Sequence, residues 1–214
     1  MISNISITGI HTDIGKTIAT AVLAEALKAD YWKPVQAGNI EDRDSLQVQL
    51  LISNGANRVH PESVILSEAI SPHEAAKIDG KKIDFTTFTF PKTKNLLLIE
   101  TAGGVLSPMA DNTTMADFVK HYQLPTILVT NNYLGSINHS LLSIEVLQNR
   151  GINILGIIAN GHPNSSSEAY IEKYSGIPII ARIPFFKSIT AVAIQQHAAL
   201  LRASLLEQLK NVKH

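Results

Sequence analysis

A glycine-bounded loop near the amino terminus has the residue types that bind polyphosphate. It begins at Gly9 and ends in the run Gly15-Lys16-Thr17. In such a loop the backbone N–H groups and the following helix N-terminus face the phosphates, a lysine contacts the β- and γ-phosphate oxygens, and the next hydroxyl binds Mg²⁺. We therefore predict that Lys16 contacts phosphate and that Thr17 binds Mg²⁺, which is the chemistry of a P-loop.

The surrounding residues favour the strand, loop and helix that a P-loop requires. A β-favouring run around Ile7 precedes the loop, and residues 17 to 28 follow it with the apolar spacing of a helix. The alternative is that the glycines only allow a tight turn, with Lys16 in solvent. Five residues, rather than the usual four, separate Gly9 from the Gly-Lys-Thr run, so the loop is a lengthened variant.

Charged side chains stand near the ends of other predicted elements. Lys33 lies near the end of a β-like run over 31–35, and Glu100 ends the continuous apolar run 96–99, which is typical of a strand buried on both faces. Asp44 begins a predicted helix after a polar loop. Because ligands of parallel sheets bind beyond the carboxyl ends of the strands, we expect Lys33 and Glu100 to lie beside the P-loop.

These three groups have definite uses at a phosphate site. A buried Glu100 would be costly unless it were paired or bound to a cation, so we predict that it shares Mg²⁺ with Thr17, and Asp44 is a candidate second carboxylate. Lys33 would stabilise charge on the phosphates. In the alternative interpretations Glu100 binds local backbone N–H groups, Asp44 caps a helix and Lys33 is solvated.

Composition limits the classes of partner. The 214 residues have zero formal net charge and no block of like charge, so we expect a small-molecule ligand and neither nucleic acid nor a membrane surface. The absence of cysteine excludes disulfides, thiolate metal sites and cysteine nucleophiles. Without a signal segment or an apolar stretch of about 20 residues, we expect a cytoplasmic protein. The histidines lack the spacing of a zinc site.

Strands and helices alternate along the chain. We predict further strands over 31–35, 64–66, 96–99, 126–130, 152–159 and 177–181, and helices over 44–52 (closed by Gly55), 113–122, 136–149, 168–174 and 190–209, with another after an N-cap at Ser71. Residues 84–91 form either an edge strand or an extended connection. This pattern predicts one three-layer α/β/α domain over 1–214 with a mainly parallel sheet, the P-loop containing nucleoside triphosphate hydrolase fold.

Several segments, in order from residue 1 to about 186, resemble the dethiobiotin synthetase family. Besides the lengthened P-loop, they are Tyr31-Trp32-Lys33-Pro34-Val35-Gln36-Ala37-Gly38, Ser71-Pro72-His73, Glu100-Thr101-Ala102-Gly103-Gly104 and Leu134-Gly135-Ser136-Ile137-Asn138-His139. The resemblance implies an ATP- and Mg²⁺-dependent ring closure in biotin synthesis. In that reaction 7,8-diaminononanoate and CO₂ form a carbamate, ATP phosphorylates it, and the second amine attacks to give dethiobiotin, ADP and phosphate.

By motif position, the resemblance also implies a role for individual residues. Catalysis would fall to Thr12, Lys16 and Lys33, and Mg²⁺ would be held by Thr17, Asp44 and Glu100. The nucleotide would contact Asp13, Ile14, Gly15, Lys16, Thr17 and Ile18, with Asn160 at the adenine. The substrate would contact Thr12, Lys33 and Ala37, and the start of a helix in the partner subunit would receive its carboxylate through Gly135, Ser136 and Asn138.

Four positions depart from the family pattern. His11 stands where Asp is usual, Asp13 where Gly or Glu is common, and Thr101 where Gly is usual. Ala37 lacks the hydroxyl that Ser or Thr provides in many members. None of these changes removes a charge that the mechanism requires.

A helix beginning near Ser136 would provide a receptor for the substrate carboxylate. Residues 131–140 contain no Lys or Arg, whereas the free N–H groups and dipole of a helix start bind carboxylates, and Gly135 allows close approach. A two-fold axis would present this helix to the other subunit, so we expect a homodimer with shared sites. The alternative is an ordinary N-cap without a ligand.

The residues also bear on three other functions. A regulatory ATPase of the deviant P-loop group would carry the lysine of Lys-Gly-Gly-x-Gly-Lys-Thr, whereas His11-Thr12-Asp13 occupy the corresponding positions. A cobyrinate amidase-type synthetase needs a cysteine nucleophile, which this chain lacks. A pure binding module would bind nucleotide without turnover stimulated by the diamine.

Overall fold

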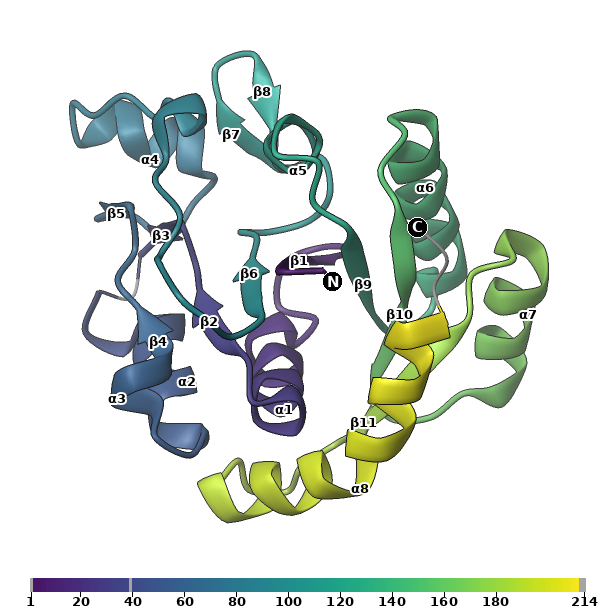
Figure 1. Cartoon of the computed structure of the whole chain (residues 1–214). Helices are drawn as coiled ribbons and strands as arrows, with labels where there is room; N and C mark the ends of the chain where they lie inside the picture. Colours follow the sequence, from purple (N-terminus) through teal and green to yellow (C-terminus); the bar gives the residue numbers. More distant parts are fainter. Residues whose placement is uncertain (1, 39, 212–214) are drawn as a thin grey trace.

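Seven parallel strands form the central sheet (Figure 1). The computed structural model describes residues 2–38 and 40–211. Within them the strand order is β11-β10-β9-β1-β6-β2-β4, and each neighbouring pair is parallel. The bounds are β1 Asn4–Gly9, β2 Asp30–Trp32, β4 Val59–His60, β6 Leu97–Glu100, β9 Thr126–Asn131, β10 Ile154–Gly161 and β11 Ile179–Pro184. This arrangement places the carboxyl ends of β1, β6 and β2 side by side.

Helices cover both faces of the sheet. On one face α1 (Lys16–Leu27), α2 (Asp44–Leu51) and α8 (Ala191–Asn211) pack against one another, and on the other face lie α5 (Met115–His121), α6 (Ser136–Asn149) and α7 (Ser165–Ser175) (Figure 1). Helix α1 is buried along most of its length because the sheet and α8 enclose it, which explains its apolar composition. The predicted three-layer P-loop fold is confirmed.

Smaller elements stand around the carboxyl ends of the main strands. Strand β3 (Val35–Ala37) pairs in parallel with β5 (Val64–Leu66), and β7 (Pro108–Ala110) forms an antiparallel hairpin with β8 (Thr113–Thr114). Helix α4 (Pro72–Ile78) contacts both pairs, and α3 (Gly55–Arg58) precedes β4. Short 3₁₀ turns span Ile40–Asp42 and Phe85–Thr87. Strands β4, β7 and β8 were not predicted, because each has two or three residues and, unlike β5, none is a continuous run of large apolar residues.

The strand predicted over 31–35 and the helix end predicted at Gly55 were wrong, and one residue explains each error. The strand predicted over 31–35 is two strands in different sheets, because Pro34 has no N–H for a ladder and its carbonyl accepts from the N–H groups of Ser63 and Val64 instead. Gly55 begins α3 and does not close α2. The left-handed residue between those helices is Asn54, at φ 54°.

Three other local predictions differ in detail. Residues 84–91 form no strand, since Asp84 accepts from the Thr86 N–H and so caps a 3₁₀ turn. Ser71 holds the N-cap position of α4, but its side chain makes no capping bond. The helix predicted from Thr113 begins at Met115, where Thr114 and Asp117 form a capping box.

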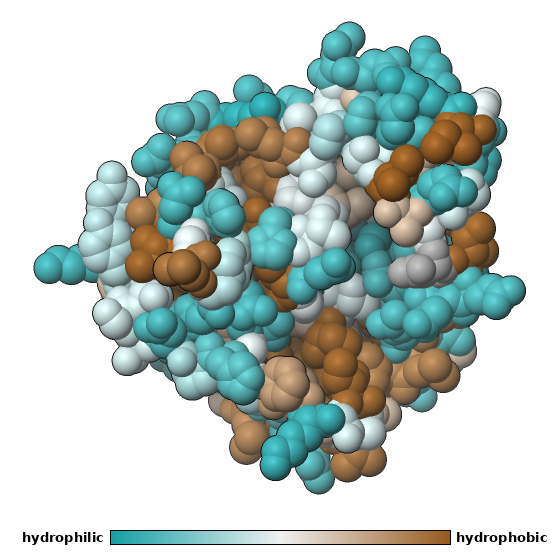
Figure 2. All heavy atoms as spheres, turned by 180° about the vertical axis from the view of Figure 1, so that it is seen from behind, coloured by the Kyte–Doolittle hydropathy of each residue, from teal (hydrophilic) through white to brown (hydrophobic). Residues whose placement is uncertain are grey.

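The outer surface is mixed. Seen from behind, hydrophilic side chains cover much of the surface, and apolar groups form separate patches (Figure 2). In the part of the chain that the structure describes, no helix combines the length and apolar character needed to cross a bilayer.

A buried ion pair holds the end of α1 against the segment that leads to β4. Glu25 accepts hydrogen bonds from Arg58 Nη1 at 3.1 Å, from the Ser53 N–H at 3.0 Å and from Lys28. Burial alone would raise the pKa of Glu25, but the bonds from Lys28, Ser53 and Arg58 outweigh it and lower this pKa to about 2. Because this value lies below that of the unfolded chain, ionised Glu25 stabilises the fold above about pH 4.5, and the contribution is lost as pH falls toward 2.

We predict that Glu25→Gln lowers the free energy of unfolding by about 3 kcal/mol at pH 7, because it leaves Arg58 buried without its partner. The difference from the parent chain should shrink at pH 3. Urea denaturation at the two pH values measures both, and Glu145→Gln, at an exposed position on α6, should stay within about 0.5 kcal/mol of the parent. An equal loss at pH 7 and pH 3 would contradict the assignment.

Candidate functional site

The lengthened loop joins β1 to α1, and its last turn has a left-handed conformation that favours glycine. Gly15 is the N-cap of α1, with φ +83°. A Cβ at this position would lie 2.2 Å from Nδ2 of Asn160, which donates a 2.7 Å hydrogen bond to the Ile14 carbonyl. Asp13 is also left-handed, at φ 58°. The end of β10 therefore fixes the end of the phosphate loop.

Four predicted site residues converge beside this loop. Lys33 forms an ion pair with Asp44, and its Nζ lies 3.6 Å from Glu100 Oε1. Thr17 Oγ1 donates to the same Glu100 oxygen at 2.9 Å. Glu100 has no exposed surface, whereas Asp44 is partly exposed. The expectation that the P-loop, Lys33 and Glu100 meet at one edge of the sheet is confirmed, and Asp44 joins them through its ion pair with Lys33. The roles of these residues stay predictions.

The two lysines are buried differently. Burial lowers the pKa of Lys16 to about 8; the Glu100 carboxylate opposes this shift, and the Lys33 ammonium adds to it. The Lys16 Nζ donates a hydrogen bond to the His11 carbonyl at 3.0 Å. Burial would also lower the pKa of Lys33, but Glu100 and Asp44 together raise it. Burial raises the pKa of Glu100, while Lys33 opposes that shift. Lys33 is thus a firmly charged cation. Lys16 forms no ion pair with a carboxylate of the described residues, so it is suited to receive a phosphate.

The oxygen ligands of the cluster fit Mg²⁺ in the presence of phosphate. Among the described residues there is no group of three His, Asp or Glu side chains that would hold a metal by themselves. Mg²⁺ usually binds through one or two carboxylates together with substrate phosphates and water, and the hydroxyl of Thr17 and the carboxylates of Asp44 and Glu100 match that requirement.

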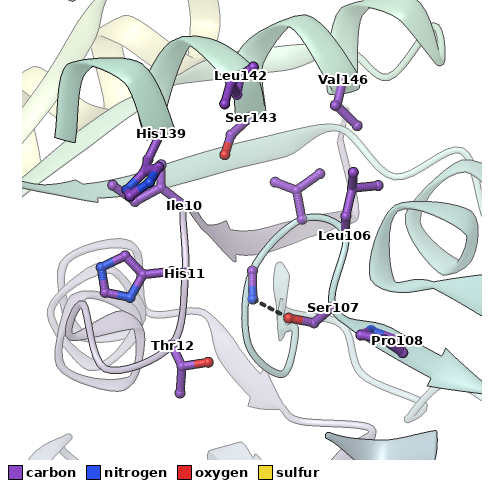
Figure 3. A pocket seen from close by; sticks show the side chains of 12 residues that line it. Ile10, His11, Thr12, Leu106, Ser107, Pro108, His139, Leu142, Ser143 and Val146 are labelled. Carbon is purple, nitrogen blue, oxygen red and sulfur yellow. Dashed lines mark hydrogen bonds between the residues drawn. The ribbon is translucent and has the colours of Figure 1, made fainter. Parts of the chain in front are cut away.

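A groove of about 440 Å³ lies between the P-loop, the loop after β6 and α6 (Figure 3). Gly104 permits this approach, because a Cβ there would lie 3.1 Å from the Cα of His11, and its N–H donates to Ser107 Oγ at 2.7 Å. One end is polar and includes Thr12, while the walls are largely apolar. The walls were not predicted from the sequence, where the Gly103-Gly104 pair is the one signal of a close approach. They include Val105, Leu106, Pro108, Leu142 and Val146.

The remaining predicted substrate residues lie on two other elements. Ala37 ends β3, opposite Leu66, and so belongs to a small sheet beside the central one. Gly135 is the N-cap of α6 with φ +99°, and no side chain caps the helix. Ser136 is buried in the first turn, while Asn138 is exposed.

A second cavity, of about 270 Å³, adjoins Asn160. The rings of His162 and Phe185 stack beside it, 4.8 Å apart and nearly parallel. Buried Glu168 accepts from Arg182 Nε at 2.7 Å and from Asn132 Nδ2 at 2.9 Å, and both of these residues line the cavity. Of these residues the motifs predicted Asn160 alone, because the others belong to no motif.

Comparison with known proteins identifies the family. A family model described as an AAA domain matches residues 3–193. The chain is 43% identical over 204 residues to the ATP-dependent dethiobiotin synthetase BioD of Christiangramia forsetii, covering 94% of this chain and 97% of that protein. It is also 43% identical over 196 residues to the enzyme of the same name from Cytophaga hutchinsonii, covering 91% and 95%. The chain belongs to the dethiobiotin synthetase family.

The dethiobiotin synthetase resemblance predicted from the motifs is therefore confirmed. Proteins outside this family share the fold. The structure of the cell division ATPase MinD of Pyrococcus furiosus matches this structure with a TM-score of 0.56 at 19% identity, over the whole of both chains. At this identity the likeness concerns the fold alone. The regulatory alternative loses support, since His11 stands near the loop start where the signature lysine would be.

We predict that Gly15→Ala lowers the free energy of unfolding by about 2 kcal/mol or more, because alanine is strained at positive φ and would displace Asn160. The matched control is Gly151→Ala, where φ is +70° but no atom lies within 4 Å, so we expect a loss of about 1 kcal/mol. Adding Asn160→Ala should recover part of the Gly15→Ala loss. Equal losses for the two glycine variants would contradict the proposed contact.

Proposed function

We propose that the chain is an ATP-dependent dethiobiotin synthetase. It joins 7,8-diaminononanoate and CO₂ through a phosphorylated carbamate and releases dethiobiotin, ADP and phosphate. The observation that carries the proposal is the buried contact of Lys33 with Asp44 and Glu100 beside a P-loop, in a chain of this family. A phosphoryl transfer needs positioned charge more than a covalent nucleophile, and this cluster provides it.

Each residue of the charged cluster has its own role in this reaction. Lys16 binds the β- and γ-phosphates. Lys33 and Thr12 bind the carbamate oxygens and the transferred phosphoryl group, and they stabilise the negative charge on both during the transfer. Thr17, Asp44 and Glu100 would hold Mg²⁺, which neutralises phosphate charge when bound. No protein base is obligatory, because a partly desolvated pocket beside cations lowers the pKa of the substrate ammonium.

The nucleotide contacts follow from the loop and from Asn160. The backbone N–H groups of residues 13 to 18, which are Asp13, Ile14, Gly15, Lys16, Thr17 and Ile18, surround the phosphates. Asn160 uses one of its two amide hydrogens on the Ile14 carbonyl. Its other hydrogen and its carbonyl oxygen remain available for the adenine edge.

The groove and the start of α6 support a homodimer with shared sites. The apolar walls suit the alkyl chain of the substrate, whose amines would lie near Thr12 and Lys33. Leu134 is fully exposed and Leu142 is half-exposed, next to the helix start formed by Gly135, Ser136 and Asn138. A partner subunit would cover these leucines and present its own helix start to the substrate carboxylate. A cytoplasmic location and the action of 1–214 as one domain stay predictions.

The first test is product formation. Purified protein given ATP, Mg²⁺, bicarbonate and 7,8-diaminononanoate should form dethiobiotin and ADP in equal amounts, as mass spectrometry and a nucleotide assay would measure.

Lys33→Ala should lower turnover at least about 100-fold, the scale for losing one preorganised charge, whereas the exposed Lys94→Ala should not. ATP hydrolysis that the diamine does not stimulate, without dethiobiotin, would favour a binding module and contradict the proposal.

The second test is complementation between subunits. Lys16→Ala should disable the P-loop, and Ser136→Glu should block the helix start with a bulky anion. If each site combines the P-loop of one subunit with the α6 start of the other, half of the sites in a mixed dimer are intact, so an equal mixture should recover about a quarter of parental activity. If mass spectrometry detects mixed dimers and no activity returns, the sites are not shared.

A further inference from the structure

Tyr31 is a buried residue of the charged cluster that no motif assigns. Its side chain has no exposed surface, and its hydroxyl donates to Glu100 Oε2 at 3.0 Å. The register of β2 and β6 explains the contact. Tyr31 lies opposite Leu98, and Glu100 follows Leu98 by two residues, so Tyr31 and Glu100 project from the same face of the sheet.

The two oxygens of Glu100 have different surroundings. Oε1 accepts from Thr17 and lies 3.6 Å from the Lys33 ammonium, whereas Oε2 accepts from the Tyr31 hydroxyl on β2. Among the described residues, Tyr31 is the one hydrogen-bond donor to Oε2. An ionised carboxylate only accepts hydrogen bonds, and a tyrosine hydroxyl carries its proton at neutral pH, so Tyr31 is the donor in this contact.

We propose that Tyr31 is a positioning residue that holds Glu100 Oε2 and thereby presents Oε1 alone to Thr17 and the Mg²⁺ position. This inference rests on the proposed function, because it assumes that Glu100 binds Mg²⁺. A hydrogen bond to one oxygen of a carboxylate restrains rotation about its terminal bond, so it favours one direction for the other oxygen. Outer hydrogen-bond partners of this kind orient metal ligands and change metal affinity when they are removed.

The hydroxyl can be removed without the ring. Tyr31→Phe keeps the packing and deletes only the donor, and Tyr122→Phe is the matched control, since its hydroxyl donates to the Phe85 and Phe88 carbonyls instead. Isothermal titration of Mg²⁺ into the complex of each chain with ADP measures the metal dissociation constant. We expect this constant to rise about 10-fold in Tyr31→Phe and to stay at the parental value in Tyr122→Phe.

Two further titrations separate the possible results. ADP without Mg²⁺ should bind Tyr31→Phe with the same affinity as the parent. If ADP affinity falls by the same factor as Mg²⁺ affinity, Tyr31 has a general structural role and the inference is overturned. Glu100→Gln should weaken Mg²⁺ binding. If it does and Tyr31→Phe binds Mg²⁺ like the parent, the role of Tyr31 is wrong while the metal assignment stands.

If Glu100→Gln also binds Mg²⁺ like the parent, the metal assignment of the proposed function fails, and the inference fails with it. Should Tyr31→Phe not fold, Tyr31→Met replaces it, because methionine fills irregular space and has no hydroxyl to donate. The same 10-fold weakening is expected of that variant, and parental Mg²⁺ affinity in it would equally overturn the inference.

Discussion

The carboxylate of Glu100 must keep its charge at a position with no contact to solvent, and much of the site follows from that requirement. Moving an isolated carboxylate from water into the interior costs several kcal/mol, so partners must offset the cost. Here they are the Lys33 ammonium and the hydroxyls of Thr17 and Tyr31. These partners come from the start of α1 and from the end of β2. The charge therefore ties the P-loop helix to two neighbouring strands.

The strand order makes this arrangement possible. Because β6 lies between β1 and β2, its last residue stands between the loop after β1 and the segment after β2. Pro34 then ends β2 and directs the chain into β3, which leaves Lys33 facing the carboxylates of Asp44 and Glu100. The loop after β6 continues to the groove beside α6, so the metal position and the substrate position lie on one edge of the sheet.

The sequence was sufficient to predict the P-loop, the parallel sheet and the meeting of Lys33 and Glu100, because the carboxyl ends of parallel strands share one edge. Asp44 begins α2, so that rule does not place it, and it was predicted only as a candidate. It was insufficient for contacts that depend on the register between strands. Nothing in the residues around Tyr31 indicates that its hydroxyl reaches Glu100, and the break at Pro34 required the competing partners Ser63 and Val64. The groove walls were missed for the same reason, since their residues come from separate elements.

The central claim is that the γ-phosphoryl group passes from ATP to a carbamate oxygen held in this cluster. The most direct measurement supplies ¹⁸O-labelled bicarbonate with unlabelled ATP and water, and follows the label in the products by mass spectrometry. Transfer to the carbamate predicts one ¹⁸O atom in the released phosphate and one in the ureido carbonyl of dethiobiotin. Phosphate that contains no ¹⁸O while labelled dethiobiotin forms would contradict the account.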